Sequence, residues 1–188
     1  MRNVALNHAE RLVSVVEIAL GESPGTVDIQ VEGDLKQGEG TGTANILPVG
    51  STLDPNGTYE CVRIPLQVST LDALLESDLL APSCSVMKID TDGYDLKVLQ
   101  GGGRFLKTSR PANFGEFSAH CLRWHGQGID DVVQFATSMN YMVWQRLDST
   151  TWQFTRDLTP DTFVQDLLLV PSERANSYAW CCETPSSL

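Results

Sequence analysis

Apolar positions in the first third of the chain predict two strands and a loop-rich segment. Residues 12–19 are rich in β-branched side chains and precede a glycine turn, which predicts a buried strand. Residues 27–32 alternate between apolar and polar side chains, which predicts a half-exposed antiparallel strand. Residues 33–58 are rich in glycine and show little periodicity, so we expect a surface excursion there, followed by a weak strand at 59–67.

The middle of the chain predicts helices that alternate with short strands. A capping-box pattern at 69–72 is expected to open a helix over 71–80. Residues 85–89 predict a short buried strand. Asp92 is expected to cap the helix that follows, and the glycines at 101–103 are expected to end it.

The last third continues the alternation and adds a late pair of strands. Residues 113–117 predict a short strand, 129–139 a helix, and both 141–147 and 163–170 further strands, the last of them almost continuously apolar. The tail at 172–188 is expected to be loosely ordered. This order of elements predicts an α/β fold, layered around a mostly parallel sheet.

Composition limits which partners and which cellular compartment we expect for this protein. The 188 residues hold 13 Lys and Arg against 24 Asp and Glu, a net charge of −11. Such an acidic surface repels phosphate backbones, so we expect no nucleic acid partner and no binding to an anionic membrane through a basic patch. No apolar stretch reaches the roughly 18 residues of a membrane-spanning helix, and the N-terminus lacks a signal-peptide core. We therefore expect no membrane insertion and a cytoplasmic protein.

Three carboxylates surround the turn after the predicted strand 85–89. Asp90, Asp92 and Asp95 lie there with Gly93 between them. In an open α/β sheet, ligands bind beyond the carboxyl ends of the strands, where carboxylates can bind an amine or accept a proton. The alternative is a purely structural role as helix cap and dipole-compensating acids, which explains Asp92 and Asp95 well and Asp90 less well.

The stretch around these carboxylates resembles a known family. Residues 88–101 read K-I-D-T-D-G-Y-D-L-K-V-L-Q-G and resemble the signature of the FkbM-type methyltransferases, K-I-D-x-E-G-x-E-x-x-V-L-x-G. Asp92 and Asp95 stand where the family usually has Glu, which shortens the side chain and keeps the charge. Weaker matches flank the signature at 3–25, 69–72, 111–116 and 165–171.

The resemblance implies both an extent and a fold. It implies a partial FkbM-like domain over residues 3–171, followed by the loosely ordered tail at 172–188. The implied fold is α/β: an incomplete class I methyltransferase (Rossmann-like) domain, with a mostly parallel sheet and a late antiparallel strand. Its first two strand–helix units, on the order of 60 residues, are expected to be missing, and with them the glycine-rich turn and the acid that hold the cofactor.

A glycine-spaced segment at 38–42 imitates that missing turn. The motif requires a strand before it and a helix after it. Neither is predicted here, because the preceding residues are polar and Pro48 opposes a helix. We therefore do not assign cofactor binding to this segment.

The resemblance implies roles for individual residues. Ala19 and Leu20 would lie beside the adenine of S-adenosylmethionine, and Asp90, with Asp92, would contribute to cofactor binding near the amine and the transferred methyl. Glu116 and His120 would face the acceptor, and either His120 or Asp90 could remove its proton. Two alternatives stay open: Glu116 as the cap of the following segment, and His120 as an ordinary surface histidine.

A metal site is not predicted. Residues 116–125 hold a glutamate, a cysteine and two histidines, but they show no clear helical period that would make ligands converge, and the five cysteines form no C-x-x-C pair. The tryptophans at 124, 144 and 152 are interpreted as core or as walls of an acceptor pocket.

The sequence thus favours an S-adenosylmethionine-dependent methyltransferase, with a hydroxyl acceptor on a small molecule or glycan, in an incomplete domain that binds its cofactor weakly or not at all. One alternative is a non-catalytic binding or scaffold domain that self-associates through an exposed sheet edge. A second is an unrelated α/β hydrolase or nuclease that uses Asp90, Asp92 and Glu116 with Mg²⁺.

Overall fold

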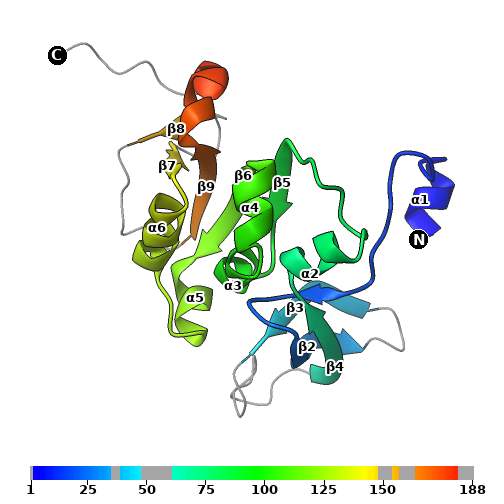
Figure 1. Ribbon diagram of the computed structural model, residues 1–188. Helices are drawn as coiled ribbons and strands as arrows, with labels where there is room; N and C mark the ends of the chain where they lie inside the picture. Colours follow the sequence, from blue (N-terminus) through cyan, green and yellow to red (C-terminus); the bar gives the residue numbers. More distant parts are fainter. Residues whose placement is uncertain (1, 35–38, 48–60, 148–153, 157–163, 182–188) are drawn as a thin grey trace.

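The computed structural model describes residues 2–34, 39–47, 61–147, 154–156 and 164–181 (Figure 1). In chain order its elements are α1 (Arg2–Leu6), β1 (Ala19–Leu20), β2 (Gly25–Asp34), β3 (Glu39–Ile46), β4 (Cys61–Ser69), α2 (Leu71–Glu76), β5 (Val86–Ile89), α3 (Asp95–Gln100), α4 (Gly103–Ser109), β6 (Ala112–Ser118), α5 (Ala119–Trp124), α6 (Ile129–Ser138), β7 (Tyr141–Arg146), β8 (Phe154–Thr155), β9 (Val164–Pro171) and the 3-10 helix η1 (Ser172–Cys181). The strands form two sheets, ordered β1-β4-β2-β3 and β5-β6-β9-β7-β8.

The first sheet is built around the predicted alternating strand. β2 pairs antiparallel with both β3 and β4, which confirms the antiparallel strand predicted at 27–32. The prediction of a loop-rich excursion is wrong at β3, because backbone pairing with β2 needs no apolar periodicity in the glycine-rich partner. β3 also continues to Ile46 as a strand where a glycine-rich cofactor turn would require a helix.

The prediction of a buried strand over 12–19 is wrong for most of its length. Only Ala19 and Leu20 are paired, parallel to the end of β4. The preceding residues are exposed, and the Leu12 side chain is 88% accessible. A run of β-branched residues becomes a buried strand only when neighbouring strands and a covering layer are available. Among the described residues of this segment, only Ala19 and Leu20 have a neighbouring strand to pair with.

The second sheet is mixed rather than mostly parallel. β5 and β6 pair in parallel, whereas β9 pairs antiparallel with both β6 and β7, and β8 pairs antiparallel with β7. β9 therefore lies in the middle of the sheet and is antiparallel to both of its neighbours. The predicted late antiparallel strand is present, but the expectation of a mostly parallel sheet has to be corrected.

Both faces of the second sheet are covered, which explains the continuous apolar run in β9. Leu167 and Leu169 point into the core formed with α3, α4, α5 and α6. Leu168 and Val170 point to the opposite face, where they pack with Trp144 and residues of η1. Since successive side chains of a strand alternate between faces, burial on both sides favours the consecutive apolar residues seen at 167–170.

The end of the chain is more ordered than predicted. Residues 172–181 form η1, in which Ala175 and Cys181 are buried, so the expectation of a loosely ordered tail is wrong there. Residues 182–188 lie outside the described part. The Arg110 guanidinium holds η1 in place, since it donates to the Glu173 carboxylate at 2.8 Å and to the carbonyls of Met139 and Asn140.

The helices are short. α6 has ten residues, close to the prediction for 129–139, whereas α2 stops at Glu76, four residues before its predicted end. No helix in the described part of the chain is long and apolar enough to cross a membrane.

Candidate active site

The turn between β5 and α3 reverses the chain through two left-handed residues. Asp92 has φ +48° and Gly93 has φ +98°. Glycine is required at position 93 for two reasons. It tolerates the left-handed backbone, and a Cβ there would lie 2.4 Å from the Cβ of Cys121. The N-cap position of α3 belongs to Tyr94, so the prediction that Asp92 caps this helix is wrong.

The last carboxylate of the signature stabilises this turn. Asp95 is fully buried and accepts the backbone N–H groups of Thr91 at 3.1 Å and Gly93 at 2.9 Å. Burial raises the pKa of its carboxyl group, and the backbone donors counter that rise. Asp95 therefore has a structural role other than the predicted helix cap: it stabilises the turn between β5 and α3.

Three of the predicted cofactor residues line one cavity, which we call the β1–β5 pocket. Ala19 and Leu20 contribute from β1, and Asp90 from the end of β5, 70 residues later in the chain than Leu20. The cavity measures about 470 Å³ and is mostly apolar. Its walls are formed by Ile18, Ala19, Leu20, Ile29, Ala44, Ile46, Leu71, Met87, Lys88, Ile89, Asp90, Thr91 and Val98.

Carboxylates gather at the carboxyl ends of β5 and β6. Asp90 forms an ion pair with Lys88 at 2.5 Å. Glu116 lies opposite Asp166 in the β6–β9 ladder, and burial followed by the charges of Asp166, Asp90 and Asp92 raises the pKa of its carboxyl group. Partial burial, then Asp90, likewise raises the pKa of Asp92. These acids therefore share one electrostatic environment, although Asp92 does not line the β1–β5 pocket.

His120 lies on a helix that the sequence did not predict. Residues 119–124 form α5, so the expectation of no helical period in this segment is wrong. Ser118 caps α5 by accepting the Cys121 N–H at 3.3 Å, which excludes Glu116 as the cap. The exposed His120 ring meets Trp124 edge to face, with centroids 5.0 Å apart, and lines neither pocket described here.

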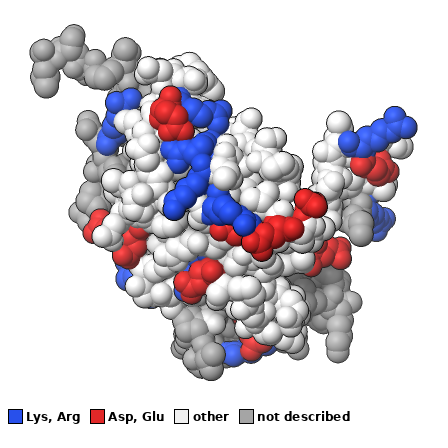
Figure 2. Space-filling view, viewed as in Figure 1, with Lys and Arg blue, Asp and Glu red and all other residues white. Residues whose placement is uncertain are grey.

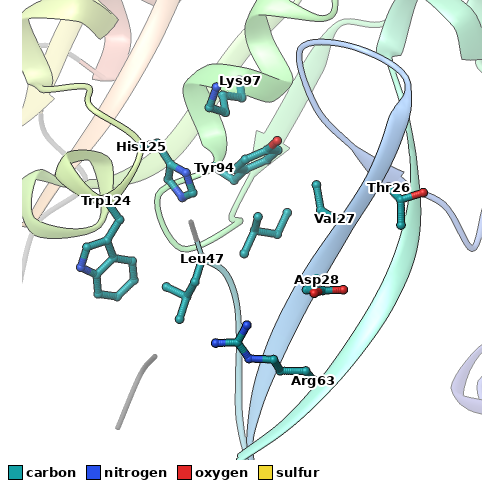
Figure 3. A pocket seen from close by; sticks show the side chains of 10 residues that line it. Thr26, Val27, Asp28, Leu47, Arg63, Tyr94, Lys97, Trp124 and His125 are labelled. Carbon is teal, nitrogen blue, oxygen red and sulfur yellow. The ribbon is translucent and has the colours of Figure 1, made fainter. Parts of the chain in front are cut away.

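A second cavity, the Tyr94 pocket, lies between the first sheet and the helices α3 and α5 (Figure 3). It measures about 500 Å³ and combines charged, hydroxyl and aromatic groups. Ile46 lines both pockets, so the two cavities are neighbours. The lining of the Tyr94 pocket consists of Thr26, Val27, Asp28, Ile46, Leu47, Arg63, Tyr94, Lys97, Trp124 and His125.

Charged side chains elsewhere are mixed in sign. On the face shown in Figure 2, basic side chains gather over α4 and η1, with acidic ones directly beside them. Two ion pairs, both at 2.8 Å, involve these elements: Arg104 on α4 with Glu76 on α2, and Arg110 at the end of α4 with Glu173 on η1. Among the described residues, no group of three or more His, Cys, Asp and Glu side chains could hold a metal ion.

The family follows from comparison with known proteins. The family model of the methyltransferase FkbM domain matches residues 2–143, most of the chain. The chain belongs to the FkbM methyltransferase family. No curated protein and no solved structure matches it.

Sequence reasoning missed most of the Tyr94 pocket. Asp28 and Arg63 reach it from neighbouring strands of the first sheet, whose pairing no local pattern reveals. Trp124 lines the pocket and Trp144 is fully buried, in agreement with the interpretation of these tryptophans as pocket wall or core; Trp152 lies outside the described residues. The signature itself could have pointed to Tyr94, since it occupies a variable position of that motif.

Proposed function

We propose that this chain is an S-adenosylmethionine-dependent methyltransferase domain that methylates a hydroxyl group, for example on a glycan. Membership of the FkbM family supports methyl transfer in general. The observation that carries the cofactor assignment is the convergence of Ala19, Leu20 and Asp90 on the β1–β5 pocket.

The lining of this pocket suits two parts of S-adenosylmethionine. Leu20, Met87 and Ile89 offer apolar walls of the kind that hold a flat purine. Asp90 offers a carboxylate to a cationic amine, and it already balances the Lys88 ammonium. Asp90 is the one carboxylate among the described residues that lines the pocket, so the ribose hydroxyls lack an acidic partner there. We therefore expect the affinity for the cofactor to be weak.

We further propose that the second sheet is part of a class I, Rossmann-like sheet. The parallel pair β5–β6 and the antiparallel β9 between β6 and β7 support this assignment. In such a sheet, ligands bind beyond the carboxyl ends of the parallel strands. Asp90 and Glu116 lie at or near those ends.

The reaction requires little of the protein beyond alignment and removal of one proton. When bound, S-adenosylmethionine supplies an electrophilic methyl group. The residues of this chain would orient the acceptor hydroxyl and take up its proton as the new carbon–oxygen bond forms. Asp90, which lines the cofactor pocket, is the proposed proton acceptor, whereas Glu116 and His120 line neither pocket.

Calorimetry and ligand-observed NMR with S-adenosylmethionine and S-adenosylhomocysteine test the assignment. We expect weak, saturable binding that Leu20→Asp abolishes and Asp90→Asn weakens. Leu79→Asp is the matched control, because Leu79 is 52% exposed on the surface. Asp90 is itself exposed, so the Asp90→Asn variant should fold. It therefore tests the assignment even if the Leu20→Asp variant does not fold. A folded wild-type chain without saturable binding would overturn the proposal.

A non-catalytic scaffold role is the second candidate. It is favoured by β5, which lies at the end of its sheet with Val86 60% exposed. Exposed strand edges promote pairing with another chain. Light scattering should then reveal a dimer that Val86→Lys dissociates. A monomer at high concentration counts against this role.

A further inference from the structure

We propose that the Tyr94 pocket binds the methyl acceptor, that this acceptor is a neutral polyhydroxylated molecule of the sugar type, and that His125 Nε2 accepts a hydrogen bond from one of its hydroxyls. The acceptor role rests on the proposed methyltransferase function. The ligand class rests on the pocket's own chemistry.

The position of the pocket suits an acceptor site. Ile46 lines both this pocket and the β1–β5 pocket, and Thr91 of the β1–β5 pocket lies three residues before Tyr94. The Tyr94 ring is buried against the end of β1, where a Cβ on Gly21 would lie 2.9 Å from the ring. The turn that carries Asp90 therefore continues directly into the wall of the second cavity.

The charged side chains of the lining are mixed in sign and favour a neutral ligand over a strongly ionic one. Asp28 and Arg63 are diagonal neighbours on one face of the antiparallel pair β2–β4, because Arg63 lies opposite Gln30, two residues from Asp28. Lys97 is in an ion pair with Glu22. Any charged ligand would meet one side chain of its own sign beside one of opposite sign, so attraction and repulsion largely offset each other. A neutral ligand with both donor and acceptor groups can use each of these side chains.

Aromatic and hydroxyl groups complete the selection for a polyhydroxylated ligand. Trp124 is half-buried and held edge to face against His120, so it offers a fixed apolar surface for the C–H face of a sugar ring. Thr26 and Tyr94 add hydroxyls that can both donate and accept. A purely apolar ligand would leave these polar groups without partners, which costs free energy.

His125 is prepared to accept a hydrogen bond. Its Nε2 is buried and has no hydrogen-bond partner among the described residues, while the ring bonds to the carbonyl of Ile46. Burial, and then the charge of Lys97, lower the pKa of the imidazole, which favours the neutral ring. A neutral imidazole has one N–H. A ligand hydroxyl can donate to the unpartnered Nε2 when this nitrogen carries the lone pair of the neutral ring.

The ring is also fixed in orientation. Tyr94 meets His125 edge to face, with centroids 5.0 Å apart and planes at 78°. A phenylalanine at position 125 can keep this packing while removing the acceptor nitrogen. This gives a variant that separates hydrogen bonding from folding.

Binding of four defined probes to the full chain tests the proposal. The probes are methyl α-D-glucopyranoside and maltose as neutral sugars, D-glucuronate as an anion and D-glucosamine as a cation, followed by saturation-transfer NMR. We expect saturable binding of the neutral sugars, with maltose quenching tryptophan fluorescence through Trp124. His125→Phe and Asp28→Asn should each weaken it about tenfold, the effect of losing one hydrogen bond.

Asp130→Asn, at an exposed position of α6, is the matched control and should leave binding unchanged. Preference for D-glucuronate or D-glucosamine, neutral-sugar binding that ignores both pocket variants, or no binding of any probe overturns the inference. The cofactor is titrated separately. Cofactor binding without sugar binding overturns this inference alone, whereas sugar binding without cofactor binding supports the ligand class and overturns the methyltransferase proposal.

Discussion

The Asp72 carboxylate on α2 accepts the backbone N–H of Phe105 at 2.7 Å, in the first turn of α4. Its second oxygen accepts the N–H of Arg104 at 2.9 Å. The N-cap residue of α4 is Gly102, which has no side chain to cap these groups. Asp72 therefore serves as the cap of a helix other than its own and ties α2 to α4.

Removing this cap should destabilise the fold. We expect Asp72→Ala to lower the free energy of unfolding by about 1 kcal/mol, measured by urea denaturation. Glu76→Ala, an acid-to-alanine change on the same helix, removes only an exposed ion pair with Arg104 and should cost less than about 0.5 kcal/mol. Equal effects of the two substitutions would show that Asp72 is not a cap.

The sequence predicted a cap at this position but assigned it to the wrong partners. The capping-box pattern at 69–72 identified the start of α2, yet Ser69 is still paired in β4 and Thr70 accepts the Ala73 N–H at 3.0 Å. The actual partners of Asp72 lie 32 and 33 residues away. Local patterns report local bonds, and contacts between distant helices follow only from the packed fold.

The triple glycine at 101–103 contains one essential and one replaceable residue. A Cβ on Gly101 would lie 2.0 Å from the Gly21 carbonyl oxygen, so Gly101→Ala should cost about 2 kcal/mol or more. A Cβ on Gly103 meets nothing within 4 Å. Gly103→Ala, in the first turn of α4, should be neutral or stabilise by up to about 1 kcal/mol. Thermal unfolding of both variants gives the comparison, and a tolerated Gly101→Ala contradicts it.

Asp95 should matter for stability, not chemistry. Asp95→Asn replaces a buried double acceptor by a group with one acceptor oxygen, so we expect a loss of about 1–3 kcal/mol in urea denaturation. Asp92→Asn is the control, since asparagine tolerates the left-handed backbone of this exposed position; its effect should stay within about 0.5 kcal/mol. If Asp95→Asn proved as stable as the wild type, the turn would not depend on this carboxylate.

The Arg110–Glu173 ion pair should make the free energy of unfolding depend on pH in the acidic range. The Arg110 guanidinium lowers the pKa of Glu173 from its ordinary 4.5 to about 2. A lowered carboxyl pKa stabilises the folded state above pH 4.5, and this contribution is lost as the pH falls towards about 2. Glu173 is half exposed, so solvent screening limits the effect to about 1 kcal/mol.

Urea denaturation at pH 7 and pH 2.5 measures this contribution. Glu173→Gln should reduce the decrease in the free energy of unfolding between pH 7 and pH 2.5. In an Arg110→Gln background, Glu173→Gln should have no further effect. Additive effects of the two substitutions would contradict direct pairing.

The candidate site was predictable only where the family resemblance covers it. Asp90, Ala19 and Leu20 were assigned to one site through the family resemblance, and they line one pocket. Arg63, Asp28 and His125 reach their pocket through the pairing of β2 with β4 and the placement of α5. Neither contact produces a recognisable residue spacing in the sequence. The glycine-rich β3 was missed for the same reason, because its pairing partner and not its own pattern makes it a strand.

The insertion of β9 between β6 and β7 has a consequence for synthesis of the protein. Both neighbours are complete before Val164–Pro171 is made, yet they are not paired with each other. The sheet can therefore close only after β9 has left the ribosome, and until then Phe117 and Trp144 lack the leucines that cover them. Such non-local closure slows folding and leaves nascent chains prone to aggregation. Chaperone dependence during translation should thus end abruptly with the emergence of β9.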